Sequence, residues 1–169
     1  MPGLTTKRLL IEPFSLDDAS FMLAMLNDPD FIANVADRGV RTVEQARRYL
    51  LEGPISSYRK HGFGMYAVRL RDNGNTIGVC GLVKRPELAD IDIGYGFLPA
   101  ARGRGLALEA AQSVWNYATE ELGLTRLVAI VAPDNAASIR LLEKLGLNYE
   151  TDIRLSPDDD PIRQYGWRA

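Results

Sequence analysis

The chain has 169 residues, of which 46% are hydrophobic and 25% charged, and its formal net charge is −2. These values are typical of a globular protein, so we expect residues 1–169 to form a single domain. Acidic and basic residues are interspersed, which argues against nucleic acid or an anionic membrane as a partner. The N-terminus lacks a signal-like apolar core, and no apolar segment reaches roughly 18 residues, so we expect a cytoplasmic protein.

The N-terminal third is predicted to be a strand followed by helices. Residues 8–14 are a short apolar run of strand length. Three pairs of residues have the spacing or chemistry that begins a helix: Ser15 with Asp18, Asp28 with Pro29, and Thr42 with Gln45. Gly53 and Pro54 are a candidate interruption of the last of these helices.

A three-strand antiparallel meander is predicted next. Residues 64–71 and 76–84 flank Asn73 and Gly74, which tolerate the positive φ angles of a tight hairpin turn. Residues 89–98 supply the third strand, whose side chains alternate between two faces. One face carries Asp90, Asp92, Gly94 and Gly96, and the other carries Ile91, Ile93, Tyr95 and Phe97. The glycines permit a ligand or another backbone to come close, or mark a bulge.

Helices and strands alternate in the C-terminal half. A helix is predicted from Leu106 to Gly123, with Trp115 on its apolar face, where we interpret it as a core residue. A β-branched strand at residues 126–131 precedes a helix at residues 136–145. Two final strands flank the acidic residues 156–161, which we interpret as a solvated loop.

The single cysteine and the single histidine are interpreted as structural. Cys80 lies in an apolar strand run, where a buried thiol is favoured over a nucleophile, and no internal disulfide is possible. His61 lies in a polar stretch that closes a helix, with no second histidine or cysteine nearby. We therefore expect no metal site.

The segment between the meander and the next helix reads Arg102-Gly103-Arg104-Gly105-Leu106-Ala107. Glycines let a backbone approach an anion closely, and the first N–H groups of a helix have no intrahelical partners. Arginines add charge that suits phosphate oxygens. The segment fits a phosphate-binding loop or a plain turn with solvated arginines. It lacks the third glycine of a dinucleotide fingerprint, and the chain lacks the Gly-Lys-Ser/Thr of a P-loop.

Arg102, Gly105 and Ala107 resemble the acyl-CoA pyrophosphate loop of the GNAT superfamily of N-acetyltransferases, whose pattern is Arg/Gln-x-x-Gly-x-Gly/Ala. Residues 134–147 resemble the second signature of that family, in which an asparagine follows the fifth strand and the helix ends at Lys-x-Gly-Phe; this chain has Leu147 at the last position. Three further segments resemble the RimJ/RimL-like subgroup, which acetylates the N-termini of ribosomal proteins: residues 4–9, 77–81 and 93–95.

The resemblance implies an α/β (α+β) fold formed by a single GNAT domain. Its central sheet would be mixed, mostly antiparallel and of about seven strands, flanked by about four helices. The fourth and fifth strands, here residues 89–98 and 126–131, would splay apart.

The resemblance also implies a binding site for acetyl-CoA. Backbone N–H groups of the loop would hold the pyrophosphate, the strand end would pair with the pantetheine amides, and Asn135 would hydrogen-bond the pantetheine arm. Ser138 would lie near the thioester sulfur; the alternative for Asn135 and Ser138 is a helix cap. The complete set is Gly96, Phe97, Leu98, Arg102, Gly103, Arg104, Gly105, Leu106, Ala107, Asn135 and Ser138.

The chemistry that the resemblance implies is direct attack of a neutral amine on the thioester. Backbone N–H groups near Tyr95 to Phe97 would stabilise the oxyanion. Leu142 stands where many family members have the tyrosine that protonates the thiolate. Ser138 matches the serine that the RimJ/RimL-like subgroup uses instead, so the resemblance implies Ser138 as the acid. Asp92 is either the base or an ordinary sheet-surface carboxylate. The predicted catalytic set is Ser138, Asp92 and Tyr95, with Asp90 and Glu12 as further candidate bases.

We therefore predict an acetyl-CoA-dependent N-acetyltransferase of a primary amine. A peptide or protein N-terminus is favoured because the pKa of an α-amine, about 7.7 to 8.0, is well below the value of about 10.4 for lysine. The alternatives are acetylation of a small-molecule amine (polyamine, amino acid or antibiotic) and a non-catalytic acyl-CoA-binding module. We expect a monomer or a homodimer.

Overall fold

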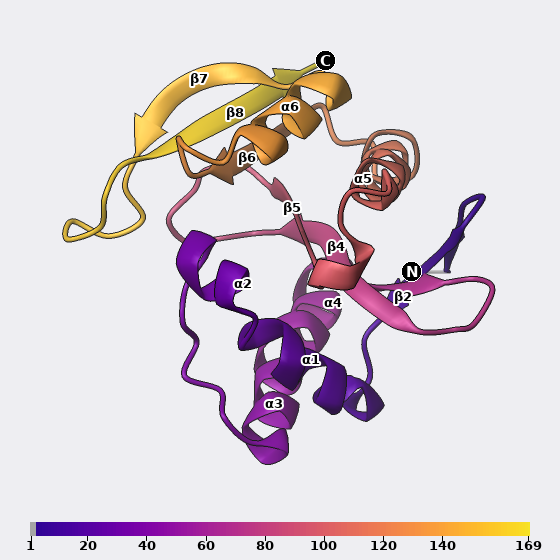
Figure 1. Ribbon diagram of the computed structural model, residues 1–169. Helices are drawn as coiled ribbons and strands as arrows, with labels where there is room; N and C mark the ends of the chain where they lie inside the picture. Colours follow the sequence, from indigo (N-terminus) through magenta and orange to yellow (C-terminus); the bar gives the residue numbers. More distant parts are fainter. Residues whose placement is uncertain (1–2) are drawn as a thin grey trace.

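A computed structural model describes residues 3–169 of the chain (Figure 1). Eight strands form one sheet in the order β1-β2-β3-β4-β5-β6-β8-β7. The strands are β1 (Leu4–Thr5), β2 (Leu9–Pro13), β3 (Met65–Leu70), β4 (Thr76–Val83), β5 (Asp92–Phe97), β6 (Arg126–Val131), β7 (Asn148–Ile153) and β8 (Ile162–Arg168). The helices are α1 (Ala19–Leu26), α2 (Pro29–Asn34), α3 (Val43–Leu50), α4 (Ser56–His61), α5 (Leu106–Asn116) and α6 (Ala136–Leu145).

The predicted fold class is confirmed, with one more strand than the roughly seven expected. The additional strand is β1, a two-residue segment in which Leu4 pairs with Ile11 of β2. Two of the α-helices among residues 3–169 also exceed the prediction of about four. One is the short α2, and the other is α4, which continues α3 through a π-helical turn at Leu51–Ile55.

The sheet consists of two antiparallel parts that meet at one point. The first part contains β1 to β5, and the second contains β6, β8 and β7. β5 and β6 are parallel and pair only at Asp92 and Val128, where Val128 N donates to Ile91 O at 3.1 Å. The two strands then diverge, which confirms the predicted splay. In Figure 1, β5 lies between the layer of β6, β8 and α6 and the group of helices α1 to α4.

The predicted caps begin three helical segments. Asp17 N donates to Ser15 Oγ at 3.2 Å, Phe31 N to Asp28 Oδ2 at 3.1 Å, and Gln45 N to Thr42 Oγ1 at 3.1 Å. The candidate interruption at Pro54 takes the form of the π-helical turn, so the helical path continues to the exposed His61. None of the helices within residues 3–169 has the length and apolar character needed to cross a membrane.

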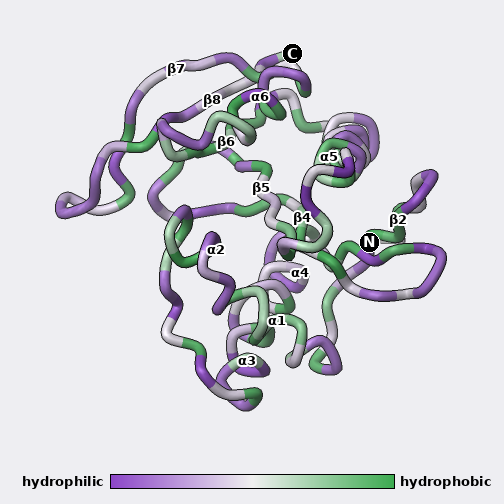
Figure 2. The backbone as a smooth tube through the Cα atoms, in the orientation of Figure 1, coloured by the Kyte–Doolittle hydropathy of each residue, from purple (hydrophilic) through white to green (hydrophobic). Residues whose placement is uncertain are grey.

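Apolar side chains pack on both faces of the sheet. One cluster lies against α5 and α6 and includes Cys80, Ile93 and Trp115, and the other lies against α1 and α3 and includes Met25. Trp115 is 9% exposed, and its ring centroid lies 5.0 Å from that of Trp167, which confirms it as a core residue. Cys80 is fully buried, as predicted. Figure 2 shows the loop between β7 and β8 as mostly hydrophilic, as expected for the acidic segment.

The structure excludes a bulge, one of the alternatives that the sequence left open for the glycines of β5. The β4–β5 register is continuous from Phe97 to Asp92, so β5 contains no bulge. A Cβ atom on Gly96 would lie 2.7 Å from Met25 Cε, and one on Gly94 would lie 3.7 Å from Met65 Sδ. Gly96 therefore permits the close approach of a methionine side chain from α1 rather than that of a backbone.

Candidate active site

The divergence of β6 leaves the backbone of β5 without a strand neighbour on one edge. Successive residues of a strand direct their N–H and C=O groups to opposite edges. Ile91 O faces β6, because it accepts from Val128 N, and so the odd-numbered residues of β5 face the opening between the strands. Tyr95 N–H and Phe97 N–H therefore face this opening, at the position predicted for oxyanion stabilisation.

The three residues predicted to pair with pantetheine amides are Gly96, Phe97 and Leu98, and they differ in the edge of the strand that their backbone groups face. Phe97 faces the opening, and its carbonyl accepts a hydrogen bond from Arg102 Nε at 3.1 Å. Gly96 is paired with Val79 and directs its backbone groups to β4. Leu98 N donates to Ile77 O at 2.9 Å. Phe97 is thus the one of the three whose backbone N–H is suited to a ligand in the opening.

Tyr95 and Ser138 approach each other across the opening. Tyr95 projects from β5 and Ser138 from the first turn of α6, and Tyr95 Oη lies 2.5 Å from Ser138 Oγ. Burial raises the pKa of Tyr95 to about 12, although its hydrogen bond with Ser138 lowers it. Both hydroxyls are therefore protonated at neutral pH. One of them donates to the other, which leaves one O–H of the pair to donate to an atom held between β5 and α6. The sequence predicted both residues without indicating that they touch.

Asn135 is the N-cap of α6. Its Oδ1 accepts a hydrogen bond from Ser138 N at 3.2 Å. The cap fixes the first turn of the helix and with it the backbone position of Ser138. Of the two residues for which a capping role was the alternative, Asn135 caps the helix, whereas Ser138 directs its hydroxyl to Tyr95.

Asp92, the first residue of β5, is a buried carboxylate with unequal oxygens. It is 1% exposed, so it is not an ordinary sheet-surface residue. Arg85 Nε donates to Oδ2 at 2.8 Å, whereas Oδ1 has no hydrogen-bond partner among residues 3–169. Burial raises the pKa of Asp92, and the ion pair with Arg85 opposes this rise. An unpartnered buried oxygen costs about 1–3 kcal/mol, which makes Oδ1 a candidate functional atom.

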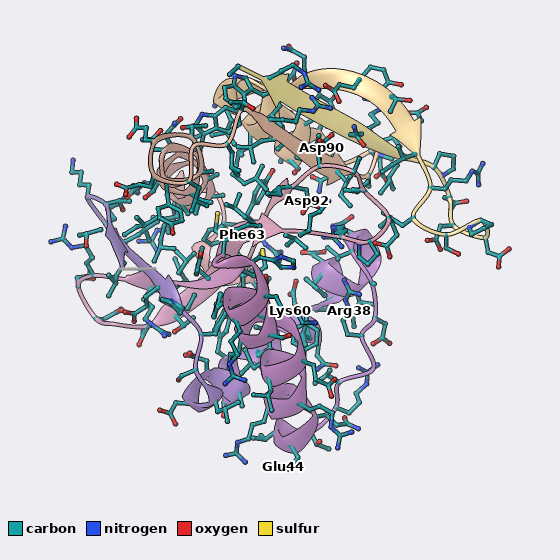
Figure 3. All side chains as sticks on the ribbon, turned by 180° about the vertical axis from the view of Figure 1, so that it is seen from behind. Arg38, Glu44, Lys60, Phe63, Asp90 and Asp92 are labelled. Carbon is teal, nitrogen blue, oxygen red and sulfur yellow. The ribbon has the colours of Figure 1, made fainter. Side chains whose placement is uncertain are left out.

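Figure 3 shows Asp92 between the part of the sheet that contains β6 and the helices on the opposite side, with Asp90 nearby. Asp90 accepts from Arg126 Nε at 3.3 Å. Glu12 lies three strands away on β2 and accepts from Arg69 Nε at 2.7 Å. Neither of these two further candidate bases has a buried oxygen without a hydrogen-bond partner, as Asp92 has.

The arginine-rich loop has the backbone geometry of an anion site. Gly103 and Gly105 both have φ +74°, a conformation that other residues rarely adopt, and Gly105 is the N-cap of α5. No side chain caps α5. The backbone N–H groups of residues 103–108 donate no hydrogen bond to any acceptor within residues 3–169. Their unpaired donors lie at the positive end of the helix dipole.

The two arginines of the loop have different surroundings. Arg102 donates to Asp28 Oδ2 at 2.8 Å and is also hydrogen-bonded to Asp30, both from the start of α2. The side chain of Arg104 is exposed and makes no hydrogen bond or ion pair within residues 3–169. The charge of Arg102 is thus already balanced by carboxylates, whereas that of Arg104 can meet an anion.

Residues 3–169 contain no group of three or more potential metal ligands.

Comparison with known proteins identifies the family. A family model described as "Acetyltransferase (GNAT) domain" matches residues 8–148. The uncharacterized N-acetyltransferase YnaD of Bacillus subtilis is 31% identical over 147 residues, which cover 87% of this chain and 83% of that protein. The uncharacterized N-acetyltransferase YoaA of the same organism is 30% identical over 156 residues, covering 90% and 86%. The chain belongs to the GNAT family and is an N-acetyltransferase, as predicted.

Solved structures share the fold over nearly the full chain. A putative GNAT-family acetyltransferase from Bordetella pertussis has a TM-score of 0.84 at 26% identity, with 100% of both chains covered. RimL, an α-N-protein acetyltransferase of a ribosomal protein that was solved with coenzyme A, has a TM-score of 0.83 at 15% identity. That comparison covers 98% of this chain and 97% of RimL. The likeness to RimL agrees with the predicted RimJ/RimL-like subgroup at the level of the fold.

Proposed function

We propose that this enzyme transfers the acetyl group of acetyl-CoA to a primary amine by direct attack within a ternary complex. The observation that carries the proposal is the opening between β5 and β6. Unpaired backbone donors, two hydroxyls and a buried carboxylate all belong to β5 or border it.

The donor would be held by backbone groups along one continuous path. The N–H groups of residues 103–108 would bind the pyrophosphate, with Arg104 supplying a charge that no carboxylate balances. The pantetheine arm would then extend along the open edge of β5, as a ligand strand adds to a sheet edge. Support for this path comes from the unpaired N–H groups and from the divergence of β6.

The transfer step forms a bond between the amine nitrogen and the carbonyl carbon and breaks the bond from that carbon to sulfur. Tyr95 N–H and Phe97 N–H would stabilise the oxyanion, and Asp92 would receive the amine proton. A CoA thiol has a pKa near the ordinary thiol value of about 8.5, so the departing thiolate needs only a weak acid. The hydroxyl pair of Tyr95 and Ser138 would supply that hydrogen bond or proton.

The acceptor we favour is a peptide or protein N-terminus. The pKa of an α-amine lies roughly 2.5 below that of lysine, which corresponds to about 3.4 kcal/mol less for deprotonation at a given pH. A single carboxylate is a weak base, so it suits the amine that loses its proton more readily. Asp92 is the one unpartnered buried carboxylate among residues 3–169, which supports this preference.

The test is a thiol-release assay with acetyl-CoA over a panel of α-amine peptides, polyamines, amino acids and aminoglycosides. We expect the highest kcat/KM for an α-amine peptide and intersecting initial-velocity lines, which indicate a ternary complex rather than an acetylated enzyme. Higher kcat/KM for a polyamine or an aminoglycoside would overturn the acceptor. Saturable acetyl-CoA binding without thiol release from any amine would indicate a non-catalytic binding module.

A further inference from the structure

The N-terminal segment around Thr6 and Arg8, which the sequence comparison with the RimJ/RimL-like subgroup singles out, binds the helix that follows the arginine-rich loop. Glu109 in the first turn of α5 accepts three hydrogen bonds from this segment. Thr6 Oγ1 donates at 2.6 Å, Arg8 N at 2.9 Å, and Arg8 Nε at 2.7 Å. Figure 1 shows β2 and α5 on the same side of the molecule.

Arg8 also contacts the loop itself. Its Nη1 donates to Arg104 O at 2.9 Å. Its Nη2 lies 3.6 Å from the position that a Cβ atom on Gly105 would occupy. One guanidinium therefore joins the carbonyl side of the loop to the first turn of α5. The peptide N–H groups of residues 103–108 make no internal hydrogen bonds, which leaves them available to an anion.

The charge of Glu109 links its contact with Arg8 to anion binding at the N-terminus of α5. Burial favours the neutral acid, but the hydrogen bonds from Thr6 and Arg8 outweigh it and lower the pKa of Glu109. The residue is therefore a carboxylate at neutral pH. A negative charge in the first turn stabilises a helix, yet it repels a phosphate bound at the same helix end. Arg8 cancels that charge at 2.7 Å.

We propose that Arg8 is a positioning residue of the donor site, which neutralises Glu109 and holds the carbonyl of Arg104 so that the loop can accept the CoA pyrophosphate. The inference rests on the proposed use of acetyl-CoA as donor. It gives the N-terminal segment a role in donor affinity rather than in the chemical step, since Arg8 contacts neither Asp92 nor Ser138 among its hydrogen bonds.

The test is calorimetric titration of the full-length enzyme with CoA at low ionic strength, for four variants. Arg8→Ala is expected to raise the Kd roughly two- to fivefold, a loss typical of an unbalanced charge at a helix end. Arg8→Ala with Glu109→Gln is expected to recover most of that loss, because the repulsive carboxylate is then absent. Glu109→Gln alone is expected to bind at least as tightly as the wild type. Lys7→Ala removes the same net charge from a neighbouring exposed residue and is expected to leave the Kd unchanged.

The outcomes separate this inference from the proposed function. An Arg8→Ala variant that binds CoA like the wild type would overturn the inference alone. A double variant that binds CoA no better than Arg8→Ala would overturn the neutralisation of Glu109, because the lost affinity would then not come from the unbalanced carboxylate. Thermal melting of each variant identifies any loss of fold, and the double variant restores affinity only if charge is the cause. Absence of CoA binding by the wild type would overturn the proposed donor and this inference together.

Discussion

The two faces of β5 differ in chemistry although the strand is only six residues long. On the face toward α5 and α6, Tyr95 meets Ser138 and both hydroxyls are protonated donors. On the face toward α1 and α3, Asp92 is followed by Gly94 and Gly96, and the space beside Gly96 is filled by Met25. One face therefore offers protons, and the other offers a proton acceptor.

This difference follows from the period of a strand, because alternate side chains point to opposite faces. A donor and an acceptor of protons can then serve the same reacting carbon without neutralising each other. In the proposed reaction the amine loses its proton on the carboxylate face, and the thiolate is hydrogen-bonded on the hydroxyl face. The backbone between them supplies the oxyanion donors.

The largest effect is expected from Asp92→Asn, which removes the proton acceptor from its face. We expect kcat/KM for the best amine of the panel to fall by roughly 10² to 10⁴, the range of general base catalysis, while the Kd for CoA stays unchanged. The measurement is thiol release together with calorimetry. Asp90→Asn, which removes one of the two carboxylates that pair with Arg126, is the matched comparison and is expected to lower the rate far less. A larger loss in Asp90→Asn than in Asp92→Asn would reverse the assignment.

On the opposite face, Tyr95→Phe and Ser138→Ala are each expected to lower kcat by roughly 10- to 100-fold. The double variant should lose less than the product of the two single losses, because the hydroxyls hydrogen-bond to each other and act as a pair. The measurement is a double-mutant cycle of single-turnover rates for the wild type, the two single variants and the double variant. Full additivity would mean that the two hydroxyls act independently.

Arg102 connects the end of β5 with the start of α2, because its guanidinium donates to Phe97 O and to Asp28 Oδ2. Arg102→Ala leaves Asp28, which is 7% exposed, without its cation. Since the Arg102 side chain is itself 38% exposed, we expect a loss of about 2 kcal/mol in the free energy of unfolding, below the range for fully buried pairs. Arg104→Ala is expected to leave stability unchanged and to weaken CoA binding. Urea unfolding measures the stability of both variants, and calorimetry measures their affinity for CoA. A loss of stability in Arg104→Ala, with weaker CoA binding only in Arg102→Ala, would contradict these roles.

The smallest effect concerns the pH dependence of stability. The pKa of Asp92 in the folded protein is raised from its ordinary value of 3.8, chiefly by burial, so the native state binds the proton more tightly than the unfolded chain. The contribution of Asp92 to stability therefore decreases as the pH rises from the ordinary pKa through the raised one. The free energy of unfolding of wild type relative to Asp92→Asn should fall over that interval and then level off. A constant difference from pH 3 to pH 8 would contradict a raised pKa.

Local features of the fold were predictable because short-range rules control them. Ser15 and Thr42 cap helices with their own side chains, and Gly103 and Gly105 supply positive φ angles that few other residues adopt. The order of the elements and the two family signatures were sufficient to predict the splay. The strand β1 was missed because two residues carry no periodicity.

Side-chain pairs between distant parts of the chain were not predictable. Arg102 and Asp28 are 74 positions apart, and Asp28 was identified only as part of a helix start. The pairing of Asp92 with Arg85 was not predictable either, although the two residues are only 7 positions apart, since nothing in the loop between them indicates which way the arginine turns. The same holds for Met25, whose position against Gly96 depends on how α1 packs on the sheet. Such contacts are decided by tertiary packing, which single-sequence patterns do not encode.

The buried Cys80 makes the enzyme well suited to study by thiol chemistry. Its side chain is fully buried, and burial raises its pKa, so the native protein presents no thiolate to a disulfide reagent. Thiol detected during turnover therefore comes from the released CoA, without a background from the protein. When no substrate is present, slow labelling of the same sulfur reports how often the centre of the sheet opens, which supplies a stability measurement for every variant without an added probe.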